Sequence, residues 1–155
     1  MNGAVSIVPY QDKYRTDFDR LNRAWVSRHF LVEPGDEKEF GDPYGHFVAP
    51  GGQVLFLISD SGGVLGTVAL AKHADLFEVA KMTVDEAHRG KGYGKVLMEA
   101  AIDYATDAGG SALELVSNTR LETAIGMYRK HGFVEVPLGG SEEYSRANIR
   151  MRREL

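Results

Sequence analysis

A glycine-rich, basic run near the middle of the chain has the residue types of an anion-binding turn. It consists of Arg89, Gly90, Lys91, Gly92, Tyr93, Gly94 and Lys95. Glycines permit tight backbone conformations and let a ligand approach the main chain closely. The free N–H groups of a helix that begins here, together with the helix dipole, favour an anion. The run therefore predicts a phosphate or pyrophosphate site, and the alternative is a solvated turn that only leads into a helix.

Two common phosphate-binding patterns do not fit this run. A P-loop has Ser or Thr directly after Gly-Lys, whereas Val96 follows Gly94 and Lys95. A dinucleotide-binding G-x-G-x-x-G pattern fails because Lys95 and Leu97 stand where its third glycine would fall. The expected phosphate ligand is therefore of another kind.

The elements around the run are those of an α/β (mixed α+β) fold. Apolar runs predict strands over 4–8, 53–59, 64–71, 75–84, 112–116, 133–136 and 145–151. Apolar residues at helical spacing, with stop signals, predict helices over 11–29, 36–40, 95–108 and 121–131. The first strands read as an antiparallel meander, and 75–116 reads as a βαβ unit with a parallel pair. We expect a central mixed, mostly antiparallel, twisted sheet of about six to seven strands with helices on both faces.

Composition restricts the class of protein. The 155 residues suit a single domain, 1–155, and the formal net charge of -4 disfavours duplex nucleic acid as a partner. Cysteine is absent, which excludes disulfides, Cys-ligated zinc and thiol nucleophiles. The five histidines lack ligand spacing, so no metal is expected. Neither a signal segment nor a membrane span is predicted, so we expect a cytoplasmic protein.

Two patterns together resemble those of the GNAT superfamily of N-acetyltransferases. Arg89-x-x-Gly92-x-Gly94, between a predicted strand and a predicted helix, is similar to the R/Q-x-x-G-x-G/A signature of its motif A. The segment 124–133, AIGMYRKHGF, is similar to its A-x-x-x-Y-x-K-x-G-F block. The resemblance covers about residues 4 to 151 and implies an acyl-CoA N-acyltransferase fold. It implies acetyl-CoA as cosubstrate and acetyl transfer to a primary amine of a small molecule or peptide.

The resemblance also implies roles for particular residues. The pyrophosphate of acetyl-CoA would lie on the run 89–95, and its pantetheine arm would pair with the preceding strand. The residues implied on the pantetheine arm are Met82, Thr83, Val84, Asn118 and Ala124. Leu121 stands where many relatives have an asparagine, and Asn118 is the expected substitute. Tyr128 occupies the usual position of the acid that protonates the departing thiolate.

The transfer reaction also needs a general base and contacts for the acceptor amine. An alkylamine, with a pKa near ~10, must lose a proton before it attacks. Glu78 lies eleven residues before Arg89, at a spacing where some superfamily members carry a catalytic Glu; the alternative is a strand Glu that faces solvent. In relatives the first helix and the segment after it cover the acceptor pocket. The expected acceptor contacts are Trp25 (which also fits core packing), Phe30, Glu33, Tyr44, His46 and, near the last strand, Arg146.

Other functions stay open at this point. Without cysteine, and with no base next to Ser117, direct attack by the amine is favoured over an acyl-enzyme. The rivals are a non-catalytic acyl-CoA sensor and an interaction protein that kept the fold without its ligand. A homodimer is an expectation from the superfamily alone. Arg150, Arg152 and Arg153 are expected on a solvated strand edge that their charge protects from pairing.

Overall fold

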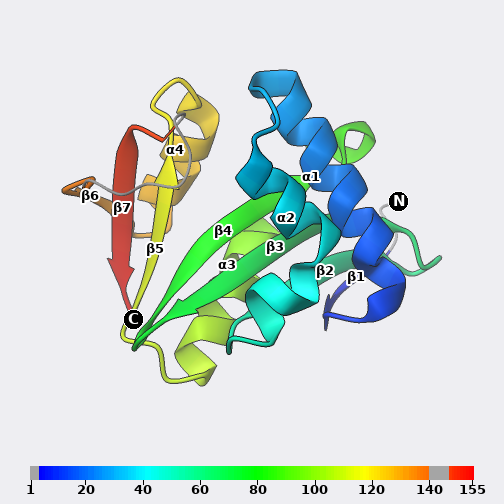
Figure 1. Ribbon diagram of the computed structural model, residues 1–155, viewed down its shortest axis with the longest axis horizontal. Helices are drawn as coiled ribbons and strands as arrows, with labels where there is room; N and C mark the ends of the chain where they lie inside the picture. The colour runs from blue at the N-terminus through cyan, green and yellow to red at the C-terminus, as the bar shows by residue number, and fades with distance from the viewer. Residues whose placement is uncertain (1–3, 140–146) are drawn as a thin grey trace.

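A seven-stranded sheet forms the centre of the computed structural model, which describes residues 4–139 and 147–155 (Figure 1). The strands are β1 (Val5–Pro9), β2 (Gln53–Ser59), β3 (Val64–His73), β4 (Leu76–Val84), β5 (Ala112–Ser117), β6 (Val134–Val136) and β7 (Ile149–Glu154). The helices are α1 (Arg15–His29), α2 (Pro34–Gly41), α3 (Tyr93–Asp107) and α4 (Glu122–Lys130). Short helical turns lie at Asp12–Tyr14, Tyr44–Val48 and Glu86–His88. Within the described residues, no helix has the length and apolar character needed to cross a membrane.

The strand order is β1-β2-β3-β4-β5-β7-β6, and all neighbours are antiparallel except β4 and β5. The parallel strands match at only two positions, Phe77 with Leu113 and Glu78 with Glu114. Beyond this short contact β4 and β5 diverge, as Figure 1 shows. The predicted meander, the parallel pair and the mostly antiparallel sheet are therefore confirmed.

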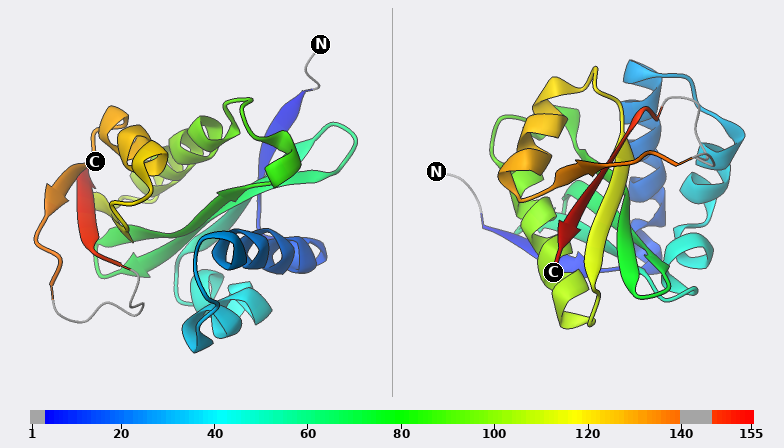
Figure 2. Two further views of the ribbon diagram at one scale, coloured as in Figure 1. Left: turned by 90° about the horizontal axis from the view of Figure 1, so that it is seen from above. Right: turned by 90° about the vertical axis from the view of Figure 1, so that its left-hand side faces the viewer.

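Helices cover both faces of the sheet, as predicted (Figure 2). On one face α3 and α4 pack through residues such as Leu97, Met98 and Ile125. On the other face α1 and α2 pack through Phe18 and Phe40, which are fully buried. The apolar stripe read from the sequence of the first helix thus has the core-facing role that its spacing predicts.

The C-terminal strand corrects one prediction. The last strand runs over Ile149–Glu154 and lies between β5 and β6, so Arg150, Arg152 and Arg153 are not on a sheet edge. The reason is cross-strand charge compensation, because Glu114 of β5 binds Arg150 at 3.2 Å and Arg152 at 2.7 Å. Ile149 and Met151 flank Arg150 in the strand and are buried on the opposite face. The charged tail therefore forms an interior strand in which Arg150 and Arg152 share one face, while Arg153, on the other face, donates to the backbone oxygen of His131 at 2.8 Å.

Candidate functional site

A cavity of about 560 Å³ opens where β4 and β5 diverge. Its walls come from both helical layers, because Trp25 of α1 and Tyr128 of α4 both line it. The segment of β4 between Glu78 and Met82 lines it as well, as does β5 from Glu114 onwards. The cavity therefore reaches both faces of the sheet through the gap between two strands.

A bulge in β4 explains why the strands part at this point. Ala69 of β3 matches Lys81, but Leu70 matches Val79, so Ala80 is an extra residue. A bulged strand bends and twists more strongly than a regular one. The bulge also sends Lys81 toward α2, where its ammonium lies 3.4 Å from Asp36 and 3.2 Å from Glu39. Ala80 and Lys81 both line the cavity, so the irregular part of β4 forms its wall.

The glycine-rich run lies between the end of β4 and the first turn of α3. Gly90 and Gly92 have φ values of 80° and 79°, in the left-handed region that glycine tolerates without strain. A glycine at the helix N-cap has no side chain to bind the first N–H groups of α3, which begins at Tyr93. Arg89, Lys91 and Lys95 are exposed around this turn. The turn thus has the backbone shape and the charge that an anion requires.

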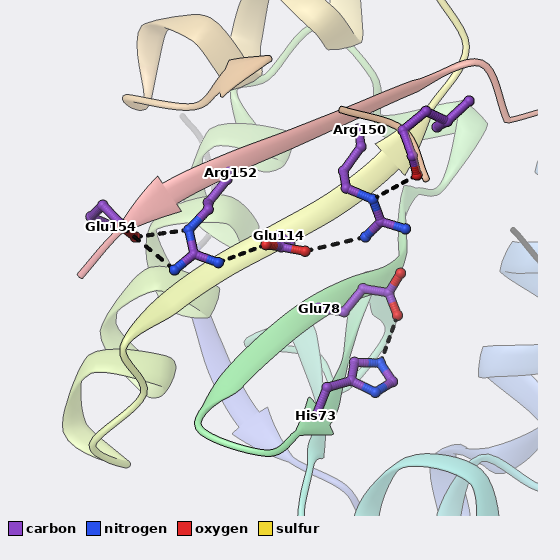
Figure 3. A network of polar contacts seen from close by, with 7 residues as sticks. His73, Glu78, Glu114, Arg150, Arg152 and Glu154 are labelled. Atoms are coloured by element: carbon purple, nitrogen blue, oxygen red, sulfur yellow. Dashed lines mark hydrogen bonds and ion pairs between the residues drawn. The ribbon is translucent and has the colours of Figure 1, made fainter. Parts of the chain in front are cut away.

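Glu78 lies on the cavity wall, with its side chain 25% exposed. Its Oε1 is 2.9 Å from Nε2 of His73, at the end of β3 (Figure 3). Its neighbour in register, Glu114, is bound instead by Arg150 and Arg152, two of the three arginines of β7. Glu78 therefore faces the cavity with a histidine as partner, whereas the charge of Glu114 is compensated within the sheet.

Tyr128 reaches the cavity from the face that α4 covers. Its ring packs 5.9 Å from that of Phe133, measured between centroids. Burial raises the pKa of Tyr128 to about 12. The phenol is therefore protonated at neutral pH and can donate a proton or a hydrogen bond to a group in the cavity.

Aromatic side chains form the wall on the face of α1. The rings of Trp25 and Phe30 lie 6.0 Å apart, and both line the cavity. The guanidinium of Arg120, from the loop before α4, lies 4.5 Å from the ring centre of Phe30. Arg120 also donates a hydrogen bond of 2.7 Å to the backbone oxygen of His29. Arg120 thereby connects the end of α1 to the loop that follows β5, across the gap between β4 and β5.

A cluster of cations surrounds the end of α1. The pKa of His29 is lowered, first by burial and then by the charges of Arg28, Arg89 and Arg120. His29 is therefore mostly neutral at pH 7. The charge of Arg89, in the glycine-rich run, thus acts on the histidine at the end of α1.

Several residues singled out in the sequence meet at the cavity, and others do not. Those that line it are Trp25, Phe30, Glu78, Met82, Asn118, Ala124 and Tyr128. Two groups of the predicted residues do not line the cavity. Thr83, Val84 and the run 89–95 follow its wall along the chain, and Glu33, Tyr44 and His46 lie elsewhere. Glu33 belongs to the start of α2, where its N–H donates to Asp36 at 2.9 Å. Arg146 lies outside the described residues.

Among the polar residues of the lining that were not selected as site residues are four titratable ones on strands: His73, Lys81, Glu114 and Arg150. Glu114 alone had a local signal, a carboxylate inside the otherwise apolar strand segment ALELV. The others meet the cavity through strand pairing and the bulge, which no local pattern indicates.

Comparison with known proteins identifies the family of this protein. Residues 10–133 match the Acetyltransferase (GNAT) family, so the chain belongs to that family. Acetyl-CoA is the cosubstrate of this family, and the glycine-rich turn and the gap beside β4 suit such a ligand. The superfamily resemblance read from the two sequence patterns is thereby confirmed.

Individual relatives agree with this assignment. An IAA acetyltransferase of Azospirillum brasilense is 34% identical over 85 residues, which cover 53% of this chain and 56% of that protein. The chain spans between 21% and 56% of the length of the curated relatives that it matches.

Solved structures share the fold at low sequence identity. A GNAT-family acetyltransferase from Staphylococcus aureus Mu50 aligns with a TM-score of 0.87 at 19% identity, over 97% of this chain and 99% of that one. The PaiA N-acetyltransferase from Thermoplasma acidophilum, solved in complex with coenzyme A, aligns with a TM-score of 0.72 at 16% identity, over 98% and 99%. The expected fold class is thus confirmed.

Proposed function

We propose that the chain transfers the acetyl group of acetyl-CoA to a primary amine of a small molecule or peptide, by direct attack of the amine on the thioester. The observation that carries this proposal is the cavity through the sheet, with Glu78 and Tyr128 on its walls. Such a cavity lets a donor enter from one face and an acceptor from the other. A carboxylate and a protonated phenol are the groups that amine activation and thiolate departure need.

The donor would be held by β4 and the turn after it. Met82, Thr83 and Val84 lie beyond the last register match with β5, so the described part of β5 does not pair with their backbone. An extended ligand with amide groups, such as the pantetheine arm, would add to this strand by main-chain hydrogen bonds. The pyrophosphate would lie on the N–H groups at the start of α3, beside Arg89, Lys91 and Lys95. Asn118 and Ala124 would contact the arm from the opposite wall.

The acceptor would enter on the face covered by α1. Trp25 and Phe30 offer apolar surface there, and Glu78 would take the proton that the acceptor amine must lose. A backbone N–H near Met82 to Val84 would stabilise the oxyanion of the tetrahedral intermediate. Tyr128 would then donate its proton to the departing thiolate.

Thermal unfolding with and without acetyl-CoA tests the donor site. Saturation at about 100 times Kd stabilises a protein by ~2.7 kcal/mol, and each kcal/mol raises Tm by roughly 2–4 °C at this chain length. We expect a rise of several degrees that the double substitution Arg89→Gln/Lys91→Gln reduces. The matched control, Arg15→Gln/Lys38→Gln, removes two exposed cations from α1 and α2 and should keep the full rise.

Thiol release from acetyl-CoA tests the transfer itself. The acceptor panel is a diamine, an α-amino acid, an aminoglycoside and a peptide with a free N-terminus. Mass spectrometry of the product, before and after mild hydroxylamine, separates a stable amide from a labile ester. A rise in Tm without thiol release from any acceptor would favour the non-catalytic sensor, and no rise at all would exclude both functions.

A further inference from the structure

His73 is the histidine among the described residues that line the cavity, and it is bonded to the proposed base. Its Nε2 lies 2.9 Å from Oε1 of Glu78. The side chain of His73 is 58% exposed, whereas that of Glu78 is 25% exposed. A single hydrogen bond, drawn in Figure 3, therefore joins the less exposed Glu78 to the more exposed His73.

Register fixes this pair on two adjacent strands. Ala71 of β3 matches Glu78 of β4, and His73 matches Leu76, so both side chains belong to the end of the same hairpin. The turn between β3 and β4 has only two residues, with Ala74 at a φ of 55°. A tight connection of this kind holds the two side chains in a defined relative position.

The other charged groups near Glu78 are engaged in ion pairs. Glu114, beside it in β5, binds Arg150 and Arg152, and Lys81 lies between the carboxylates of Asp36 and Glu39. Arginine and lysine do not exchange protons readily near neutral pH, because their ordinary pKa values lie far above it. An imidazole is the side chain suited to accept and release a proton in that range.

We propose that His73 is a proton relay that returns Glu78 to its ionised form after each turnover. This inference rests on the proposed function, because it assigns a partner to the base of that reaction. His73 acts through Glu78 and does not itself touch the acceptor.

The proton balance is simple. The N–H bond of the attacking amine breaks, and its proton passes to the carboxylate of Glu78. The exposed imidazole of His73 exchanges its ring proton from Nε2 to Nδ1 through solvent, so Nε2 can accept the proton of the carboxyl group and the ring becomes an imidazolium. The imidazolium loses a proton to solvent, and both residues regain their starting charge.

Steady-state kinetics in dilute buffer test the relay, with the fastest amine of the panel above as acceptor. His73→Ala and His73→Gln should lower kcat by about 10²-fold, at the lower end of the range for a positioned proton-transfer group. The KM for acetyl-CoA should stay unchanged. Added imidazole should restore kcat of His73→Ala, because a free imidazole can carry the same proton. The matched control is Lys72→Ala, an exposed neighbour in β3 outside the cavity lining, which should behave like the wild type.

A double variant separates a relay from a structural role. Because His73 acts through Glu78, His73→Ala should cause no further loss in a Glu78→Gln background, and imidazole should not rescue that variant. Full activity of His73→Ala in dilute buffer would overturn the relay. So would a loss that imidazole leaves unchanged, or one that appears as a raised KM. Absence of thiol release from the wild-type protein with every amine would overturn the proposed function and, with it, the relay.

Discussion

Glu78 and Glu114 are register partners in the last matched pair of the parallel strands β4 and β5, and their charges are compensated differently. Glu114 binds two guanidinium groups, so its charge is compensated within the sheet. Glu78 has the imidazole of His73 as its partner and lines the cavity beside the divergence of the strands. One sheet position thus carries a structural carboxylate, and its neighbour carries a carboxylate available for chemistry.

Replacing Glu78 tests its role as the base. Glu78→Gln keeps the size of the side chain but cannot accept a proton, so kcat should fall by about 10² to 10⁴-fold. The rise of rate with pH should become flatter, and the Tm increase caused by acetyl-CoA should persist. Glu135→Gln, at an exposed position in β6, is the control for the lost charge. An unchanged pH profile in Glu78→Gln would assign the proton transfer to water.

Replacing Tyr128 tests the acid. Tyr128→Phe removes the phenolic proton and keeps the packing against Phe133. We expect kcat to fall by about 10²-fold or more, with a much smaller change in the Kd of acetyl-CoA measured by calorimetry. A full kcat in this variant would remove Tyr128 from the mechanism.

Alkaline pH should destabilise the protein through two tyrosines. The folded-state pKa values of Tyr10 and Tyr128 are both raised from 10.0 to about 12, in each case chiefly by burial. A raised pKa means that the folded state binds the proton more tightly than the unfolded state. The resulting stability is fully present below pH 10 and is lost as pH rises toward 12.

Urea unfolding between pH 9 and about 11.5 measures this loss. Tyr128→Phe and Tyr10→Phe should each make the decline with pH shallower. Tyr44, which is 52% exposed, supplies the control substitution Tyr44→Phe. If the free energy of unfolding fell equally steeply with pH in all three variants, Tyr10 and Tyr128 would not be the cause of the alkaline loss.

The bridge between β5 and β7 should contribute to stability. Glu114→Gln leaves Arg150 and Arg152 without their shared carboxylate, and the Glu114 side chain is only 15% exposed. We expect a loss of about 1–3 kcal/mol in the free energy of unfolding. Glu154→Gln removes a carboxylate that also binds Arg152 but is 75% exposed, and it should cost less than about 1 kcal/mol. Equal losses in the two variants would mean that burial does not decide the contribution.

Two glycines with equal space around them should respond in opposite directions to alanine. A Cβ at Gly92 or Gly126 would meet nothing within 4 Å, so neither substitution causes a clash. Gly92 has a φ of 79°, and Gly92→Ala should therefore destabilise by about 1 kcal/mol or more. Gly126 lies inside α4, and Gly126→Ala should stabilise by roughly 0.5–1 kcal/mol. Denaturant unfolding of both variants checks the signs, and a stabilising Gly92→Ala would contradict the backbone argument.

Features that depend on residues close together in the sequence could be predicted, whereas features that depend on distant residues could not. The strands, the helices and the glycine-rich turn are set by neighbouring residues, so periodicity and turn residues predict them. Tyr128 and Glu78 were found because they stand in or near recognisable patterns. Arg150 and Glu114 are 36 positions apart, and their pairing needs the register of β5 with β7. The bulge at Ala80 and the partnership of His73 with Glu78 likewise depend on how β3 and β4 align.

The two register matches between β4 and β5 have a mechanical consequence. They divide the sheet into a four-stranded half, β1 to β4, and a three-stranded half, β5 to β7, with only a short seam of main-chain pairing between them. Across the rest of the seam, α3 packs against both halves, and Arg120 of the second half binds the end of α1. A ligand that fills the gap and pairs with the free side of β4 therefore becomes a temporary part of the sheet, and its binding energy adds to the cohesion of the protein.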